Sequence, residues 1–515
     1  MKIVTAEQMR EIDKRAAEEY DVPSLLLMEN AGLETCRAAI SMLSDLLGNS
    51  VLIVAGKGNN GGDGFAAARH LTDSGVAVTV ALAADADEVK GDARANLEIV
   101  FRMGIRCLQV ADAADIRELL ASCDLVIDAL LGTGVKGPVT GIAADIINAI
   151  NESGNPVISI DLPSGVSADT GERAGPCVHA TQTITLALPK IGLVTYPAAE
   201  HVGRLTVTDI GIPKALIDKS DLKLDLLTDE MIRERLPVRK ADAHKGAFGH
   251  LGVFAGSVGM TGAASLTSEA AARVGAGMVT LGCPWSLNDI LEVKLTEAMT
   301  VPLPETATRS ISRDAVDAAA SMLKRCNSVA IGPGLGRDPD TVRFVHALLS
   351  TLDLPAVIDA DGLNALAEKP EVLKNLKSPA VITPHPGEMS RLIGTTSAAI
   401  QSDRLKAAAE AAARFGTVVV LKGARTVIAA PDGRAFISPT GNPGMASGGV
   451  GDVLTGAIGG FLAQGLSALD AAICGVYLHG LAGDLAAEDL AEAGLIASDL
   501  LPRLPPAIRG LRTGD

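Results

Sequence analysis

Aromatic residues are scarce in this sequence of 515 residues, where one Trp, three Tyr and eight Phe together make up 2%. Few rings are therefore available to stack on nucleobases, and a formal net charge of -16 repels a phosphate backbone. Both features argue against nucleic acid as a partner. Small anionic ligands are still compatible with the acidic chain, because a few backbone amides are enough to hold a phosphate group.

Cysteines and long apolar runs are also few. The seven cysteines are widely spaced and include no C-x-x-C pair, which is typical of reduced thiols rather than of a disulfide framework or a zinc site. The first ten residues lack the apolar stretch of a signal peptide, and other apolar segments are too short to cross a bilayer of about 30 Å. We therefore expect a cytoplasmic protein without a membrane partner. We also expect it to form a homo-oligomer.

The chain is longer than one hydrophobic core accommodates, since single cores stop growing near about 250 to 300 residues. Short β-branched runs alternate with helical patterns over the first 215 residues and again from residue 250 onward. This alternation is typical of parallel sheets covered by helices on both faces, so we expect an α/β protein with two three-layer αβα domains. Residues 214–240 are charged and show no strand pattern. We place the domains at 1–215 and 225–515.

The expected strands are short apolar runs, most of which end in a polar or glycine-rich turn. In the first domain they lie at 51–55, 76–82, 124–129, 156–161, 182–188 and 205–209. In the second they lie at 250–255, 278–283, 328–331, 356–359, 380–383 and 418–422, before two Ala- and Leu-rich helices at 450–464 and 468–487. Because parallel strands end at one edge of their sheet, functional groups should gather there in each domain.

The strongest motif is G-N-P-G-M-A-S-G-G-V-G-D at 441–452, which leads into an apolar helical pattern. Glycines allow successive N–H groups to face one point, and the following helix adds the positive end of its dipole, so the motif predicts an anion-binding loop. Asp452 lies at the start of that helix, where a carboxylate beside a phosphoryl group can accept a proton from an attacking hydroxyl. The simpler interpretation is that Asp452 only caps the helix.

Three further segments follow expected strands of the second domain. They are A-G-S at 255–257 with G-A-A at 262–264, T-P-H-P-G-E at 383–388, and L-K-G-A-R-T at 421–426. Glu388 could hold a water molecule bound to magnesium near the phosphates, and residues 422–426 could line a nucleotide. His385, between two prolines, could equally be a structurally locked histidine. None of these segments decides the function alone.

In this order, the four segments resemble those of the ribokinase-like superfamily and, within it, the ADP/ATP-dependent NAD(P)H-hydrate dehydratases. The resemblance covers most of residues 225–505, including H-K-G-A-F-G-H at 244–250, G-P-G-L-G at 332–336 and D-A-D-G-L-N at 359–364. It implies a ribokinase-like αβα fold and phosphoryl transfer from ADP or ATP with Mg²⁺. The hydrated nicotinamide would contact Ala263, Gly334, His385 and Asp452. The nucleotide would contact Lys422, Gly423, Ala424, Arg425, Thr426 and Gly451.

In the first domain, the strand at 51–55 runs into G-K-G-N-N-G-G-D-G-F at 56–65, which lacks the G-x-G-x-x-G spacing of dinucleotide-binding folds. Its two adjacent asparagines offer amide oxygens that suit a large cation or a ligand hydroxyl. Two more turns follow strands, D-A-L-L-G-T-G-V-K-G-P at 128–138 and D-L-P-S-G-V at 161–166. The three turns predict that Asp63, Asp128 and Asp161 surround one cleft, although each aspartate could equally cap its own turn.

These turns, with T-L-A-L-P-K-I-G-L at 185–193, resemble those of NAD(P)H-hydrate epimerases over roughly residues 1–215. The resemblance implies a Rossmann-like αβα domain, and a carboxylate such as Asp161 is suited to carry the proton in catalysis. It implies that the hydrate is bound by Asn59, Asn60, Gly61, Gly62, Asp63, Gly132, Thr133, Gly134, Val135, Lys136, Gly137, Pro138 and Asp161. It also implies a potassium ion held by Asn60, Asp128 and Ser164.

Together the two resemblances predict a bifunctional enzyme that repairs hydrated NADH and NADPH. The first domain would interconvert the R and S epimers. The second would dehydrate the S epimer with ADP or ATP, releasing phosphate and AMP or ADP. Two alternatives stay open: a ribokinase-like vitamin or sugar kinase with a regulatory N-terminal domain, which would release a stable phosphorylated product, and an N-terminal domain that is only a binding or scaffold module. The second alternative predicts loss of the polar residues that are present at 59, 60, 63, 128 and 161.

Overall fold

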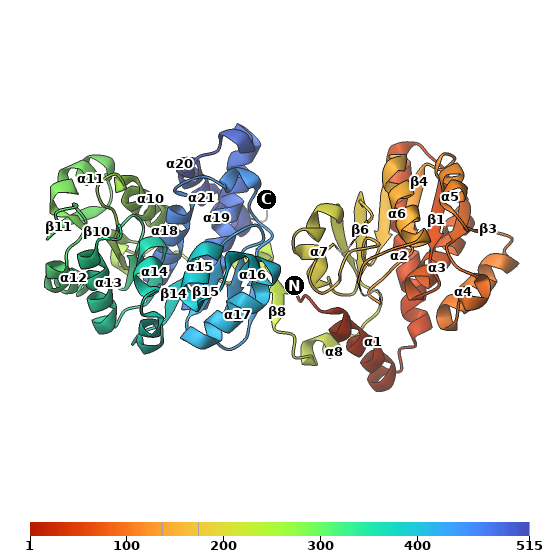
Figure 1. Cartoon of the computed structure of the whole chain (residues 1–515), viewed down its shortest axis with the longest axis horizontal. Coiled ribbons are helices and arrows are strands. Elements are labelled where there is room, and N and C mark those ends of the chain that lie inside the picture. The colour runs from red at the N-terminus through yellow and green to blue at the C-terminus, as the bar shows by residue number, and fades with distance from the viewer. Residues whose placement is uncertain (135–136, 174, 514–515) are drawn as a thin grey trace. The chain divides into compact units, whose positions relative to one another are not determined.

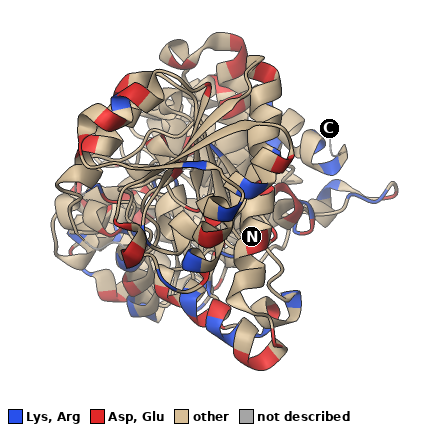
Figure 2. Cartoon of the chain, turned by 90° about the vertical axis from the view of Figure 1, so that its right-hand side faces the viewer, with Lys and Arg blue, Asp and Glu red and all other residues tan. Residues whose placement is uncertain are grey.

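The chain folds as two compact units, each built around its own sheet (Figure 1). The computed structural model describes residues 1–134, 137–173 and 175–513. The N-terminal unit is Lys2–Leu222, and the C-terminal unit is Lys223–Asp515 together with Met1. Acidic and basic residues are interspersed along the ribbon of the chain (Figure 2).

The sheet of the N-terminal unit is parallel throughout, in the order β3-β2-β1-β4-β5-β6-β7. Its strands are β1 (Ser50–Ala55), β2 (Ala77–Leu82), β3 (Arg106–Gln109), β4 (Leu125–Ala129), β5 (Val157–Ile160), β6 (Gln182–Leu186) and β7 (Arg204–Thr208). The strand order changes direction between β1 and β4. Ligands of open α/β sheets bind at such a switch point, beyond the carboxyl ends of the strands.

Helices cover both faces of this sheet, because successive strand residues point to opposite sides. The helices are α1 (Ala6–Tyr20), α2 (Ser24–Leu46), α3 (Asn59–Asp73), α4 (Gly91–Arg102), α5 (Ala113–Leu120), α6 (Ile142–Ser153), α7 (Ile191–Val194) and α8 (Lys214–Lys219). In β1, Ile53 belongs to an apolar core with α2, α3 and α4, whereas Leu52 belongs to a second core with α5 and α6. The unit therefore has three layers.

The C-terminal sheet has the order β11-β10-β9-β12-β13-β14-β15-β16-β17-β8. It is parallel from β11 to β15, β16 is antiparallel to both of its neighbours, and β8 is parallel to β17. The strands are β8 (Leu224–Leu226), β9 (His250–Phe254), β10 (Met278–Pro284), β11 (Met299–Leu303), β12 (Ser328–Ile331), β13 (Ala356–Ile358), β14 (Ala380–Ile382), β15 (Val418–Leu421), β16 (Val427–Ala429) and β17 (Ala435–Ile437). The direction of the order changes between β9 and β12, which marks the second switch point.

Two helical layers also enclose this sheet. The helices are α9 (Asp229–Arg233), α10 (Thr261–Arg273), α11 (Asn288–Lys294), α12 (Val316–Leu323), α13 (Pro339–Thr351), α14 (Ala360–Leu366), α15 (Pro386–Ile393), α16 (Ser397–Ser402), α17 (Arg404–Phe415), α18 (Val450–Ala463), α19 (Ala468–Leu490), α20 (Ala497–Leu500) and α21 (Leu504–Thr513). In β9, Val253 packs into the core of α10, α18 and α19, whereas Phe254 packs into the core of α12, α13 and α17.

The α/β class and the three-layer arrangement expected from the sequence are confirmed. The expectation that residues 214–240 contain no strand is wrong, because β8 lies there and pairs with β17. This edge strand has three residues and carries Asp225, so it lacks the apolar run by which strands are found in a sequence. The expected set also omits β3, β11, β16 and β17.

None of the helices in the described part of the chain combines the length and apolar character that a membrane span requires.

Candidate active sites

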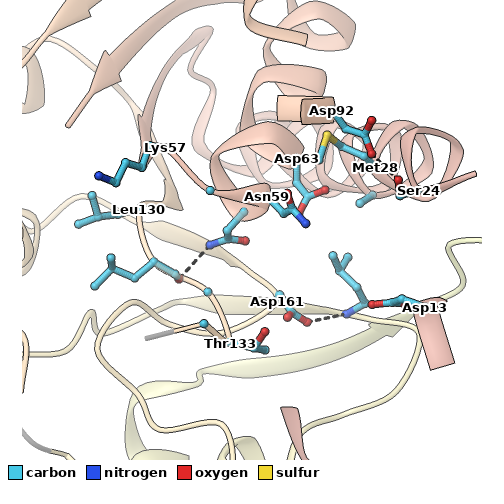
Figure 3. A pocket seen from close by; sticks show the side chains of 18 of the residues that line it. Asp13, Ser24, Met28, Lys57, Asn59, Asp63, Asp92, Leu130, Thr133 and Asp161 are labelled. Carbon is cyan, nitrogen blue, oxygen red and sulfur yellow. Dashed lines mark hydrogen bonds between the residues drawn. The ribbon is translucent and has the colours of Figure 1, made fainter. Parts of the chain in front are cut away.

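The N-terminal unit contains a cavity of about 650 Å³ at the carboxyl ends of its central strands. The lining includes the turn 56–60 after β1, the turn 130–134 after β4, Asp161 after β5 and Lys190 after β6. Figure 3 shows Asp63 across the cavity from Asp161. The prediction that polar groups gather at this edge of the sheet is therefore confirmed.

Asp161 is held in place by several hydrogen bonds. It adopts a φ of 65°, in the left-handed region that non-glycine residues seldom occupy. Its carboxylate accepts hydrogen bonds from the Lys190 ammonium, from the Leu186 N–H at 3.2 Å and from the Thr185 hydroxyl at 3.3 Å. Lys190 is 1% exposed. None of these donors belongs to the turn of Asp161, so the turn-capping interpretation of this residue is wrong.

Two further carboxyl groups share the cavity with this ion pair. Burial, together with the charge of Asp161, raises the pKa of Asp63 in α3 well above its ordinary value. Burial also raises the pKa of Asp13 in α1 to about 6, with Lys190 opposing the shift and Asp161 adding to it. The sequence interpretation singled out neither Asp13 nor Lys190. Lys190 lies within the motif at 185–193, whereas Asp13 has no sequence signal that distinguishes it from the other charged residues of α1.

Asp128 does not line the cavity, contrary to the expectation that it shares one cleft with Asp63 and Asp161. It is fully buried, and its carboxylate accepts hydrogen bonds from the Ser164 hydroxyl at 2.5 Å, the Ser164 N–H at 2.8 Å and the Ser159 hydroxyl at 2.9 Å. Burial raises the pKa of Asp128, although these hydrogen bonds oppose the shift. The carboxylate therefore connects β4 to the turn after β5.

Hydrogen bonds to the Leu131 backbone connect Asn60 to Ser164, which in turn is hydrogen-bonded to Asp128. The Asn60 side-chain amide donates to the Leu131 carbonyl at 2.9 Å, and the Leu131 N–H donates to the Ser164 hydroxyl at 2.8 Å. The Asn60 Oδ1 atom is buried and accepts no hydrogen bond from any described residue. An unsatisfied buried amide oxygen near a buried carboxylate and a hydroxyl fits a monovalent cation such as K⁺, because all three groups offer oxygen.

Two of the predicted binding glycines pack inside the unit. A Cβ on Gly61 would lie 1.9 Å from the Gly56 carbonyl oxygen, and one on Gly62 would lie 2.6 Å from Met28 Cε. The close packing of α3 therefore requires both glycines. Of the other predicted positions, Asn59, Asn60, Asp63, Gly132, Thr133, Gly134 and Asp161 line the cavity, and Gly137 and Pro138 do not. Val135 and Lys136 lie outside the described residues.

In the C-terminal unit, the predicted anion-binding loop leads into α18, whose first turn contains Asp452. Gly449 precedes the helix with a φ of 92°, and no side chain caps the helix start. The capping interpretation of Asp452 is therefore wrong, and the leading N–H groups of α18 are available to a ligand. Asp484 anchors the beginning of the loop, because it accepts hydrogen bonds from the Gly441 N–H and the Asn442 side-chain amide, both at 2.9 Å.

The surroundings of Asp452 move the pKa of its carboxyl toward neutral pH. Burial raises the pKa of this carboxyl to about 7, with Asp359 adding to the shift and Lys422 opposing it. A carboxyl group with such a pKa can exchange a proton at physiological pH, which suits a general base. The sequence analysis singled out Asp452, and the structure adds that its carboxyl has a raised pKa.

Lys422 links the ends of three neighbouring strands. Its ammonium lies 2.6 Å from the Asp359 carboxylate and 3.8 Å from that of Glu388. Asp359 is 1% exposed and also accepts a hydrogen bond from the Thr455 hydroxyl of α18 at 2.7 Å. Burial lowers the pKa of Lys422, but the charges of Asp359 and Glu388 outweigh it, so the pKa is raised. A Cβ on Gly451 would lie 3.4 Å from the Lys422 ammonium, so this glycine allows α18 to approach closely.

His385 and Glu388 form the start of α15. His385 Nδ1 accepts the Gly387 N–H at 2.9 Å, and the Glu388 carboxylate accepts the His385 N–H at 2.8 Å. This capping box gives both residues a structural role, while the His385 side chain stays 52% exposed. Among the described residues, no three His, Cys, Asp or Glu side chains form a group that could hold a metal ion. A magnesium ion near Glu388 would therefore need the phosphate oxygens of a nucleotide as further ligands.

The remaining predicted contacts lie at the same edge of the sheet. Gly334, after β12, has a φ of 64°, and a Cβ there would lie 3.0 Å from that of Ala263 in α10. Asp361 accepts the Gly336 N–H at 2.9 Å and adds to the raised pKa of Asp452. The turn between β15 and β16 carries Gly423, Ala424, Arg425 and Thr426. The Arg425 guanidinium donates to the Pro439 carbonyl at 2.7 Å, which ties that turn to the segment before the glycine loop.

Two family models match the chain. The model described as the N-terminus of YjeF-related proteins matches residues 24–192, and the model described as NAD(P)H-hydrate dehydratase matches residues 251–506. The chain is 49% identical over 517 residues to the bifunctional NAD(P)H-hydrate repair enzyme of Moorella thermoacetica, covering 99% of this chain and 97% of the relative. An enzyme of the same name from Thermofilum pendens is 42% identical over 515 residues, again covering 99% and 97%.

Solved structures similar to the chain include an ADP/ATP-dependent NAD(P)H-hydrate dehydratase from Bacillus subtilis, co-crystallised with ATP and Mg²⁺. It is 34% identical, with a TM-score of 0.49. The match covers 56% of this chain and 98% of that protein.

Proposed function

The chain belongs to the family of bifunctional NAD(P)H-hydrate repair enzymes, and from this premise we propose that its two units repair hydrated NADH and NADPH in two steps. The N-terminal unit interconverts the R and S epimers of the hydrate. The C-terminal unit dehydrates the S epimer with ADP or ATP and releases NAD(P)H, phosphate and AMP or ADP. This membership favours repair over the alternatives of a vitamin or sugar kinase and of a scaffold module.

The observation that carries the dehydratase step is Asp452 beside an uncapped helix start. The N–H groups of the glycine loop and of α18 bind the terminal phosphate of the nucleotide. Asp452 accepts the proton of the hydroxyl on the hydrated ring while that oxygen attacks the phosphorus. The ring nitrogen lone pair then expels phosphate to give an iminium, and loss of a proton from the neighbouring ring carbon restores the reduced cofactor.

The surrounding residues bind and orient the two substrates. Lys422 and the turn 423–426, with Gly451, contact the nucleotide, and Ala263, Gly334 and His385 contact the hydrated ring. The Lys422 ammonium, held by Asp359 and Glu388, places a fixed positive charge close to Asp452. Mg²⁺, when bound, neutralises phosphate charge during transfer, and Glu388 would hold its water shell.

The epimerase step takes place in the cavity of the N-terminal unit. The reacting carbon bears both a hydroxyl and the ring nitrogen, so it can lose and regain its configuration through an iminium or ring-opened form. Asp161, fixed by Lys190, is placed to take the hydroxyl proton. K⁺, when bound by Asn60, Asp128 and Ser164, would supply positive charge at the edge of the cavity.

Two assays on the full chain test this proposal separately. The purified R epimer, incubated without nucleotide, should yield the S epimer, as followed by chromatography. The purified S epimer, given Mg²⁺ and ADP or ATP, should regain the absorbance of NADH. Epimerisation that occurs only in the presence of nucleotide, or a stable phosphorylated product in the second assay, would contradict the assignment.

A further inference from the structure

Asp13 is a carboxyl group of the epimerase cavity that lies outside the segment 24–192 matched by the family model. It lines the cavity with Asp63, Asp161 and Lys190. Figure 3 shows Asp13 on the same side of the cavity as Asp161, and both the Lys190 ammonium and the Asp161 carboxylate act on it electrostatically. The Asp13 Oδ1 atom is buried and accepts no hydrogen bond from any described residue.

The charges in the cavity leave Asp13 without a cationic partner. Lys190 directs its ammonium at Asp161, the Leu186 carbonyl and the Thr185 hydroxyl, so its three N–H bonds are occupied. Lys57 and Arg10 also line the cavity but are exposed, and Lys57 pairs with Glu88 at 3.2 Å. Within the described part of the chain, neither Asp13 nor Asp63 forms an ion pair. Burial without a cationic partner favours the protonated form of both carboxyl groups, so their pKa values are raised.

Epimerisation through a ring-opened form needs a proton acceptor and a proton donor at neighbouring atoms. When the hydroxyl loses its proton, the electron pair of that O–H bond forms a carbonyl. The bond between the carbon and the ring nitrogen then breaks, and its electron pair passes to the nitrogen, which takes up a proton. Reclosure on the other face of the carbonyl reverses each step, so atoms and charge balance without an oxidant or another reactant.

We propose that Asp13 is the proton donor to the ring nitrogen and works as a pair with Asp161, the proton acceptor. The hydroxyl and the nitrogen are bonded to the same carbon, so both proton partners must reach the same part of the bound ring. Figure 3 draws Asp13 on the same side of the cavity as Asp161 and draws Asp63 on the opposite side, and the charge of Asp161 acts on both carboxyl groups. The Lys190 ammonium is hydrogen-bonded to Asp161, so it does not form an ion pair with Asp13. The inference rests on the proposed epimerase function.

The test is the substitution Asp13→Asn in the full chain. It preserves the size of the side chain and removes its transferable proton, so kcat for epimerisation should fall by about 100-fold to 10,000-fold. KM for the hydrate should change little, and dehydration of the purified S epimer should keep its rate. Glu11→Gln, a carboxyl-to-amide change at an exposed position of α1, is the matched control and should leave both activities intact.

The pH profile separates a proton donor from a group that only holds Lys190 in place. The titratable or charged groups that line the cavity with Asp13 include Asp161 after β5, Lys190 after β6, Asp63 of α3, and Arg10 of the same helix as Asp13. A donor must be protonated, so the wild-type rate should decline as the pH rises through the titration of Asp13. Asp13→Asn should lose this decline, and Asp13→Glu should restore both the decline and part of the rate.

Each outcome has a distinct meaning. A wild-type chain that does not epimerise the hydrate would refute the proposed function. A wild-type chain that epimerises, combined with an Asp13→Asn variant that keeps its kcat and pH profile, would refute the role of Asp13 alone. Thermal unfolding checks that the variant is folded. If Asp13→Asn does not fold, Asp13→Glu decides, because an altered alkaline decline supports the donor role and an unaltered one overturns it.

Discussion

Replacing Asp452 by Asn should abolish dehydration and at the same time stabilise the C-terminal unit. Burial, with a contribution from Asp359, raises the pKa of this carboxyl from 3.8 to about 7. Since the native pKa lies above that of the unfolded chain, the native state binds the proton more tightly. The carboxyl therefore carries no penalty at pH values below 3.8, destabilises the native state increasingly up to pH 7, and carries its full penalty above that.

The size of this effect follows from the two pKa values. They differ by about three, and each step of one is worth about 1.4 kcal/mol, so the penalty above pH 7 has an upper limit of about 4 kcal/mol. Asp452 retains partial exposure, and access of water to the carboxylate reduces its cost. We expect Asp452→Asn to raise the free energy of unfolding by about 2 to 4 kcal/mol at pH 8 and by much less at pH 4.

Denaturant unfolding at the two pH values measures this gain. Trp285 is the single Trp of the sequence and belongs to the C-terminal unit, so its fluorescence reports on that unit. Asp432→Asn is a suitable control, because the Arg434 side chain beside Asp432 lowers the pKa of this exposed carboxyl, and its replacement should not stabilise the unit. A gain for Asp452→Asn that is equal at both pH values would refute the reasoning, as would unimpaired dehydration by the variant.

Three other predictions concern the ion pair of each unit and the cation site. Asp161→Asn should slow epimerisation by about 100-fold or more while dehydration of the S epimer persists; chromatography of the epimers would detect an unaltered rate and thereby refute the assignment. Lys422→Met leaves Asp359 buried without its cation and should lower the free energy of unfolding by about 3 to 5 kcal/mol. Denaturation would measure this loss, which a second change, Asp359→Asn, should largely reverse; an unaffected single variant would contradict the role of the pair. Replacing K⁺ by tetramethylammonium should slow epimerisation by the wild-type chain but have no further effect on Asn60→Leu, and a rate independent of the cation would argue against the site.

The turns that carry the sites could be predicted because their signals are local. A polar or glycine-rich turn after an apolar run marks the carboxyl end of a parallel strand, and this rule located Asp161, whereas a glycine-rich loop that leads into an apolar helix located Asp452. The same rule could not separate Asp128 from Asp63 and Asp161, since all three follow or enter such turns. Only the fold shows that Asp128 is fully buried, with its carboxylate hydrogen-bonded to Ser164.

The partners of the site residues could not be predicted, because they are distant in the sequence. Lys190 lies 29 positions from Asp161, and Lys422 lies 63 positions from Asp359. Asp13 comes from a helix with several charged residues, and nothing in its spacing marks the position that faces the cavity. The edge strand β8 was missed for a related reason, since its place depends on pairing with β17, more than 200 residues later.

The most direct test of the two-step account follows the absorbance of NADH after the full chain, Mg²⁺ and ADP or ATP are added to an equal mixture of both epimers of hydrated NADH. The account predicts that the whole mixture returns to NADH with the wild-type chain, and that the Asp161→Asn variant slows sharply once the S epimer is consumed. A wild-type reaction that stops at the S fraction, or identical progress curves for the two chains, would contradict it.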